Sequence, residues 1–264
     1  MERLFSVVSE EKKKEGVLLW EWGEHFCCSA WFDKNDNILH NLDYYSFQDL
    51  DPLSIESIIR EVMPGNVKET IICSAFKEAL LVPPRIFNIN QSFPDLIYPD
   101  AGGRLFNDMI AEWQVINQYN VPLVIYNSIS NEVPNVSCLH SFTCSLKVNN
   151  GMDAPIQLNV QFDTKQFRVL LKKEGKILLA QIYPYSVPLD VVYYLLKILQ
   201  QHDLNQEDTH LIVSGLIEED SALFKELYNY FLNMEIAKPG SISLENNNYP
   251  AHFFTSIYNL AACV

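Results

Sequence analysis

The same order of segments occurs twice along this chain, and the duplication limits its fold more than any other feature. The second copy is the clearer one: apolar residues alternate with polar ones through 156–162, then again at 167–171 and 177–183. Alternation of this kind is typical of strands with one solvent-exposed face. A helix with leucine spacing follows from Ser186 and Pro188, then the short apolar strand "HLIVSG" and a helix in "EEDSALFKELYNYFLN".

The first copy repeats this order closely. Two strands are predicted in "GVLLWEWGEHFCCSAWFD" and a third in "ILHNLDYYSF", followed by a helix in "DPLSIESIIREV" and a buried strand in "ETIICSA". The segments "DPLSIESII" and "VPLDVVYYLL" correspond in the two copies, as do "TIICSA" and "HLIVSG". Two copies of strand–strand–strand–helix–strand predict an internally duplicated α/β protein.

We expect the two halves to cover residues 1–150 and 151–264, because the run "KVNNGMDAP" near 147–155 breaks the periodicity. Residues 76–147 fit the repeat less well. "EALLVP" is predicted as a strand and "PLVIYNSISN" and "SFTCSLKV" as short helices, while "RLFNDMIAEWQVINQYN" is compatible with helix or strand.

Composition excludes several partners. The chain has 264 residues, 48% of them hydrophobic, so a sizeable core is expected. Its net charge of −14 would repel nucleic acid and anionic membranes, and there is no basic patch. There is also no apolar run of signal-peptide or membrane-spanning length. We therefore expect a cytoplasmic protein that neither binds nucleic acid nor inserts into a membrane.

The six cysteines are expected to be buried thiols of a reducing compartment. Cys138, His140 and Cys144 could ligate a metal, but the segment lacks a second pair of closely spaced cysteines, so no metal site is predicted. Cys27 and Cys28 alternate across a strand, and no acidic or amide side chain is in place to orient His25, so no catalytic nucleophile is predicted there either. We interpret His252 as a capping or packing residue.

Several segments together resemble a family of uncharacterised bacterial proteins that is assigned the actin-like ATPase fold as a domain of unknown function. These segments are "EALLVPPRIF", "VPLVIYNSISNEVPNVSCLHSFTCSLK", "LNVQFDTKQFRVLLKKEGKILLAQIYPY", "VVYYLLKIL" and "LIVSGLIEEDSALFKELYNYFL". More distantly, the chain is similar to the actin-like scaffold proteins of type II secretion and pilus assembly. The resemblance implies an α/β protein with a duplicated ribonuclease-H-like fold, two mixed sheets flanked by helices. It also implies a strand at Gln114–Asn120 and a helix at Pro122–Asn131.

The resemblance also indicates where a nucleotide would bind. ATPases of this superfamily place an Asp-x-Gly turn after the first strand of each half, whose backbone N–H groups hold phosphate while the aspartate positions Mg²⁺. Here the first turn is Glu21-Trp22-Gly23 and the second is Asp163-Thr164-Lys165. The turn that would hold adenosine is Ser214-Gly215-Leu216, with one glycine instead of two.

Each of these motifs is half present, so the candidate residues Glu21, Gly23, Asp163, Thr164, Ser214 and Gly215 are interpreted as remnants of nucleotide motifs. The simplest alternative makes Asp163 and Gly23 ordinary turn residues and Glu21 an exposed strand end. The acidic residues 218–220, expected at the start of a helix, would repel a triphosphate.

Three functional hypotheses follow. The first is a non-catalytic actin-like protein without a cofactor that acts through protein–protein contacts, either with an unidentified partner or as a homodimer. The alternative is a Mg-dependent ATPase or phosphotransferase of the actin/hexokinase type, with Glu21 and Asp163 holding the metal in an interdomain cleft. A sensor of another small ligand is the third. Aromatic residues in "YPYS" and "NNNYPAHFF" are candidate contact residues, unless they pack between the halves.

Overall fold

The computed structural model describes residues 1–9, 16–63, 67–87, 93–99, 102–148, 154–238, 240–245 and 248–264. Contacts divide the chain into two units. Unit 1 comprises Met1–Asn149, Gly240–Asn248 and Ser256–Val264, and unit 2 comprises Asn150–Pro239 and Tyr249–Thr255. Two C-terminal segments, Gly240–Asn248 and Ser256–Val264, therefore belong to unit 1.

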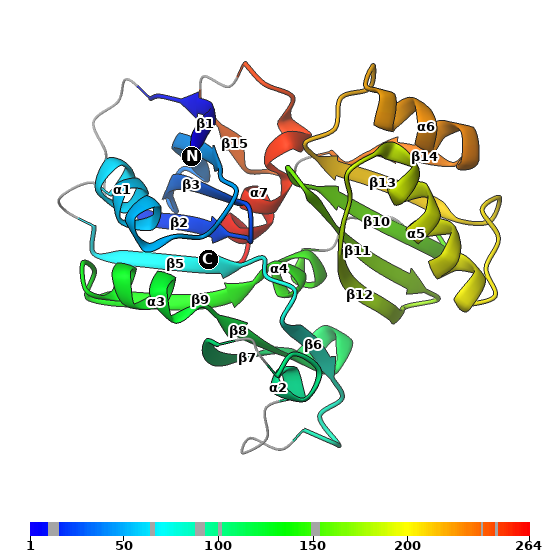
Figure 1. The fold of residues 1–264 in the computed structure, drawn as a ribbon, viewed down its shortest axis with the longest axis horizontal. Coiled ribbons are helices and arrows are strands. Elements are labelled where there is room, and N and C mark those ends of the chain that lie inside the picture. Colours follow the sequence, from blue (N-terminus) through cyan, green and yellow to red (C-terminus); the bar gives the residue numbers. More distant parts are fainter. Residues whose placement is uncertain are drawn as a thin grey trace. The chain divides into compact units, whose positions relative to one another are not determined.

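Unit 1 is built on a sheet whose strands run in the order β1-β4-β3-β2-β5-β9, with β15 paired to β4 (Figure 1). Antiparallel pairing joins β1, β4, β3 and β2, and parallel pairing joins β2, β5 and β9. The strands are β1 (Glu2–Val7), β2 (Val17–Trp22), β3 (Phe26–Asp33), β4 (Ile38–Ser46), β5 (Glu69–Ser74), β9 (Asn135–His140) and β15 (Ser243–Leu244).

Every residue of β2 and β3 is buried, because helices cover both faces of this sheet. On one face, Trp20 and Ile72 pack with Ile58 of α1 (Pro52–Val62) and Ile125 of α3 (Leu123–Ser130). The opposite face carries the alternate residues of the same strands, and it is covered by α7 (Thr255–Ala261). The helix α4 (Ser141–Lys147) follows β9 directly.

Local sequence accounts for the start of α1. Asp51 precedes the helix in extended conformation, and its carboxylate accepts a hydrogen bond of 3.0 Å from the backbone N–H of Ser54. Pro52 occupies the first helical turn, where its missing N–H costs nothing. The predicted helix in "DPLSIESIIREV" is therefore confirmed, and the structure adds Asp51 as its capping residue.

A second, three-stranded sheet of unit 1 resolves the ambiguous region. Its order is β6 (Ala79–Val82), β8 (Val115–Val121), β7 (Arg104–Ile110), all antiparallel, and α2 (Phe93–Ile97) packs against β6 and β8. A short 3-10 helix, η1 (Ala111–Trp113), and the left-handed residue Gln114 connect β7 to β8. The strand and helix implied by the resemblance for this region, now β8 and α3, are confirmed.

Unit 2 repeats the plan with the strand order β12-β11-β10-β13-β14. Its strands are β10 (Ile156–Phe162), β11 (Gln166–Lys173), β12 (Lys176–Pro184), β13 (His210–Gly215) and β14 (Met234–Ile236). As in β4-β3-β2-β5-β9, three antiparallel strands are followed by two parallel additions. The predicted duplication is therefore present in the sheet topology itself, and the fold is α/β.

Two helices, α5 (Pro188–Gln201) and α6 (Ala222–Tyr230), pack against each other in unit 2. The apolar face of α5 and Leu227 of α6 join the strands in one core. The expectation that α6 starts with acidic residues is wrong. Residues 218–220 are exposed and precede the capping residue Ser221, whose hydroxyl accepts a hydrogen bond from the N–H of Phe224. The 3-10 helix η2 (Ala251–Phe254) also belongs to this unit.

Among the described residues, none of the helices combines the length and the apolar character that crossing a bilayer requires.

Candidate functional site

The first turn remnant lies where β2 ends in unit 1. Glu21 is buried, with 3% of its surface exposed, and its carboxylate accepts a hydrogen bond of 2.5 Å from the hydroxyl of Ser256 in α7. In the sheet, Glu21 is paired with Cys28 on one side and Cys73 on the other. The interpretation of Glu21 as an exposed strand end is therefore wrong, because α7 covers this face of the sheet.

Gly23 closes the same turn through the chain's own groups. Its N–H donates to the carbonyl of Phe26 at 2.9 Å, and a Cβ at this position would lie 2.3 Å from the Phe26 ring. That ring in turn stacks on Tyr44, with centroids 5.5 Å apart. The glycine is needed here because an aromatic side chain of the protein occupies the space beside the backbone.

The second turn remnant contains a buried ion pair. A guanidinium nitrogen of Arg168 lies 3.1 Å from Oδ1 of Asp163, and both side chains are 4% exposed. Arg168 stands opposite Gln161 in the hairpin, so the pair spans the first two strands of unit 2. The hydroxyl of Tyr185 donates to the carbonyl of Asp163 at 3.0 Å. Burial and the nearby Asp163 carboxylate raise the pKa of Tyr185 to about 12.

The backbone of this turn is also bonded internally. The N–H of Asp163 donates to the carbonyl of Gln166 at 2.9 Å, and the carbonyl of Lys165 accepts from the N–H of Tyr185 at 3.0 Å. Thr164 is half-buried and Lys165 is exposed. The expectation that Asp163 forms a turn is confirmed. The sequence pattern did not indicate that its charge would be buried against Arg168.

The third remnant meets the second at one end of β10. Gly215 is paired with Phe162, the residue before Asp163, and a Cβ on Gly215 would lie 2.1 Å from the Phe162 carbonyl oxygen. Gly215 also has φ of +78°, and Leu216 donates its N–H to the same carbonyl at 2.8 Å. Ser214 is buried. Close contact between two strands is therefore sufficient to require this glycine.

His252 lies near this end of unit 2 in η2. Its Nε2 is 2.7 Å from the carbonyl oxygen of Ile217, which can only accept, so Nε2 carries a proton. The ring also packs edge-on against Phe253. The packing role expected for this histidine is confirmed.

The aromatic contact candidates pack inside unit 2. Tyr183 stacks on Tyr194 with centroids 4.6 Å apart, and Tyr185 meets the edge of Phe162. Phe253 and Phe254 are buried. Asn246 and Asn247 of the second candidate segment lie outside the described residues. The packed aromatic rings are therefore part of the fold of unit 2, and we do not retain them as a contact surface.

Among the described residues, the cysteine and histidine side chains considered as metal ligands are not arranged to hold a metal ion. Both ring nitrogens of His140 are engaged: Nδ1 accepts from the N–H of Phe142 at 3.1 Å, and Nε2 lies 3.0 Å from the Phe76 carbonyl. Within the described ranges there is no group of three or more His, Cys, Asp or Glu side chains able to hold a metal. Cys27 is fully buried, and burial raises the pKa of its thiol.

A buried polar network in unit 1 has no signal in the sequence pattern. Asp108 of β7 accepts hydrogen bonds from the hydroxyls of Tyr119 and Thr143, at 3.1 and 2.7 Å, and from the N–H of His140 at 3.1 Å. Burial raises the pKa of this carboxyl, and the hydrogen bonds oppose the rise. The network joins β7, β8, β9 and α4, which ties the small sheet to the main sheet of unit 1.

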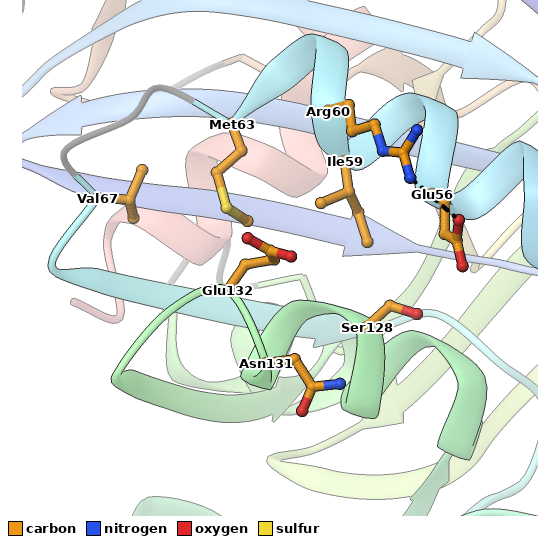
Figure 2. Close-up of a pocket in the computed structure, with 8 residues that line it drawn as sticks. All are labelled: Glu56, Ile59, Arg60, Met63, Val67, Ser128, Asn131 and Glu132. Atoms are coloured by element: carbon orange, nitrogen blue, oxygen red, sulfur yellow. Dashed lines mark hydrogen bonds and ion pairs between the residues drawn. The ribbon is translucent and has the colours of Figure 1, made fainter.

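Among the pockets formed by the described residues, two with linings entirely in unit 1 bear on the site. The larger, about 530 Å³, opens between α1 and α3, where Figure 2 shows Met63, Ile59 and Glu132 around it. At its edge Arg60 pairs with Glu56, one turn away on α1. This mixture of apolar and oppositely charged side chains does not select one class of ligand.

The smaller pocket, about 300 Å³, is lined in part by the acidic side chains of Glu24, Asp49 and Glu78, and we call it the acidic pocket. It lies between the main sheet and the small sheet of unit 1, and it contains Glu24 and His25 from the turn that follows Gly23. Its lining residues are Glu24, His25, Gln48, Asp49, Leu50, Phe76, Glu78, Gly102, Asn120 and Pro122. Burial and the nearby Glu24 carboxylate raise the pKa of Glu78. Leu50 and Phe76 are apolar members of the same lining.

Comparison of the structure with solved structures shows the actin-like ATPase fold. A Bacteroides thetaiotaomicron protein with that fold and unknown function matches with a TM-score of 0.72 and 17% identity, over 94% of this chain and 96% of that one. PilM in the PilM–PilN type IV pilus biogenesis complex matches with a TM-score of 0.66 and 10% identity, over 95% and 99%. The ethanolamine utilization protein EutJ from Carboxydothermus hydrogenoformans matches with a TM-score of 0.50 and 10% identity, over 97% and 92%.

No curated protein matches this sequence. A family model does match, over residues 30–234, which is most of the chain. This chain therefore belongs to the family described as protein of unknown function DUF3822.

Proposed function

We propose that this protein is a non-catalytic member of the actin-like fold that acts by binding a partner protein. The observation that carries the proposal is the buried pair of Asp163 and Arg168, 3.1 Å apart. An aspartate in this turn would otherwise position Mg²⁺ and its waters. Here a guanidinium already supplies the positive charge, and it stays protonated at any physiological pH.

The first turn supports the same proposal independently. A phosphate held by the backbone at Gly23 would have to displace the Phe26 ring, which lies against that glycine and stacks on Tyr44. The Glu21 carboxylate, the remaining candidate for metal binding, is buried and already bonded to Ser256. Both turns are thus filled by the protein's own groups.

Thermal unfolding with and without millimolar MgATP, MgADP and MgGTP tests this proposal. Saturation at 100 times Kd would add about 2.7 kcal/mol, or roughly 2–4 °C in Tm for a chain of this size. We expect no shift. The matched variant carries Asp163→Asn with Arg168→Met, which removes the ion pair without leaving a buried charge. A shift in the natural protein that disappears in this variant would replace the proposal with a Mg-dependent ATPase or phosphotransferase.

The acidic pocket is where we propose that the partner binds. PilM, which shares the fold, is found in a complex with PilN, so the fold is compatible with a protein-binding role. In this chain, Glu24, Asp49 and Glu78 line the pocket together with the apolar side chains of Leu50 and Phe76. Charge complementarity favours a partner segment with lysine or arginine beside an apolar anchor residue.

Affinity capture from a lysate of the source cells, quantified by mass spectrometry, tests the location. The variant Glu24→Lys with Asp49→Lys should lose the captured partner, and binding to the natural protein should weaken as salt rises. The control Glu218→Lys with Glu219→Lys makes the same charge change on an exposed loop of unit 2 and should retain the partner. Equal capture by both variants would exclude the acidic pocket.

A second copy of this chain is the other partner that we consider, and sedimentation of the purified protein at several concentrations distinguishes a homodimer from a hetero-complex. We also propose a cytoplasmic location, in agreement with the thiol state of the six cysteines.

A further inference from the structure

Three cysteines from distant parts of the sequence meet in unit 1. Cys73 is in β5, Cys144 is in α4, and Cys263 follows α7 near the C-terminus. The thiol of Cys144 is within hydrogen-bonding reach of the sulfur atoms of both Cys73 and Cys263. The sulfur of Cys263 also lies 4.0 Å from the carbonyl oxygen of Cys144. All three residues are thiols.

The three thiols differ in their access to solvent. Cys73 is fully buried and Cys144 is 1% exposed, whereas Cys263 is only half-buried. A solute that reaches this cluster therefore meets Cys263 first. The hydrogen bond from Cys144 stabilises a thiolate at Cys263 and lowers the pKa of Cys263, while the same bond, the contact with Cys73 and burial raise the pKa of Cys144.

We propose that Cys263 is a modification site that reacts with hydroperoxides, and that Cys144 resolves the product to an intramolecular disulfide. The inference rests on an accessible sulfur held beside a buried one, and it is independent of the proposed function.

The chemistry balances with hydrogen peroxide as the oxidant. The Cys263 thiolate attacks one peroxide oxygen, the O–O bond breaks, and protonation of the leaving oxygen gives water and a sulfenic acid on Cys263. The Cys144 sulfur then attacks the Cys263 sulfur and loses its proton, the S–O bond breaks, and the departing hydroxyl takes up that proton and leaves as a second water. Two thiols are oxidised by two electrons and one peroxide is reduced to two waters.

The new bond would join α4 to the C-terminal segment. Between these cysteines the chain leaves unit 1, forms unit 2 and returns, so the disulfide would close a covalent loop around that excursion. The same C-terminal segment includes α7, whose Ser256 donates to Glu21. Oxidation would therefore fix α7 to the rest of unit 1 beside the first turn remnant.

The test uses the full-length reduced protein, treated with equimolar hydrogen peroxide and then digested without reductant. We expect one new cross-linked peptide pair containing Cys144 and Cys263, lighter than the two separate peptides by two hydrogen atoms. Retention of both thiols, or a disulfide between two chains, would overturn the proposal.

Three variants distinguish an activated thiol at Cys263 from one that is only accessible to solvent. In Cys144→Ser, dimedone should trap a sulfenic acid on Cys263, and in Cys263→Ser the fast loss of thiol should disappear. Cys138→Ser is the matched control: Cys138 is also half-buried, but burial raises the pKa of its thiol to about 12, so its removal should change nothing. Equal dimedone labelling of Cys138 and Cys263 would show that exposure alone governs the reaction and would refute an activated site.

Circular dichroism checks that each variant is folded. If Cys144→Ser does not fold, the peptide map of the natural protein and the thiol loss in Cys263→Ser still decide the outcome, since Cys263 is only half-buried and its substitution leaves the core intact.

Discussion

At the scale of single residues, the candidate nucleotide positions have acquired structural roles. Asp163 and Arg168 neutralise each other in a buried hairpin, and Gly215 allows β13 to lie against the carbonyl of Phe162. The groups that contact these residues belong to the same chain. Substitutions at these positions should therefore change stability before they change any binding property.

Replacing Arg168 by alanine should lower the free energy of unfolding by about 3–5 kcal/mol, because the Asp163 carboxylate remains buried without its compensating charge. Urea unfolding measures the loss. The double variant Asp163→Asn, Arg168→Met should recover most of it. Arg60→Ala, which removes an exposed partner of Glu56, is the control and should cost less than about 1 kcal/mol. Similar losses at both arginines would contradict the buried-pair account.

Gly215→Ala and Gly175→Ala form a second matched pair. Both glycines have positive φ, +78° and +72°, so each alanine should cost about 1–2 kcal/mol from backbone conformation. Only at Gly215 would the added Cβ meet a backbone oxygen, at 2.1 Å, whereas nothing lies near it at Gly175. Thermal unfolding should therefore show a much larger drop in Tm for Gly215→Ala, and equal drops would argue against close packing of β13 on β10.

At the scale of elements, the polar network around Asp108 connects the small sheet to the main sheet of unit 1. Four elements contribute to it, and each contributes a single polar side chain or N–H group that looks unremarkable in its own segment. Fully satisfied networks of this kind specify one arrangement of the elements, because any other leaves buried polar groups without partners.

The raised pKa of Asp108 predicts a pH dependence with a definite sign. The unfolded carboxyl titrates near 3.9, and the folded one above it, so between these values the folded state binds more protons and the stability contribution falls as pH rises. Denaturant unfolding of the natural protein and of Asp108→Asn should be compared from pH 4 upward. As pH rises, the free energy of unfolding of the natural protein should fall relative to that of Asp108→Asn. A difference that stays constant or changes in the opposite direction would contradict the raised pKa of Asp108.

At the scale of the whole molecule, the C-terminal residues complete the first unit. Ile257, Leu260 and Ala261 of α7 are buried, and Leu244 of β15 lies in the same unit. A division of the chain at residues 150–151 therefore separates unit 1 from part of its own core.

A fragment of residues 1–150 should consequently lack a cooperative unfolding transition. The same fragment joined through a flexible linker to residues 240–264 should regain one, because it restores the segments that cover the sheet. Circular dichroism during heating compares the two fragments with the full chain. A cooperative transition in the shorter fragment, at the same temperature as in the longer one, would show that α7 and β15 are dispensable.

By itself the sequence predicted the duplication and the repeated order of strands and helices, because the spacing of apolar residues reports which face of each element is buried. The actin-like plan followed from the resemblance to a known family. The resemblance also led to the interpretation of Glu21, Gly23, Asp163, Thr164, Ser214 and Gly215 as remnants of nucleotide motifs. Only the tertiary structure decided what contacts them: Ser256 reaches Glu21 across 235 positions, and Phe26 fills the space beside Gly23. A local pattern cannot show such partners, because they are selected by packing between elements that are remote along the chain.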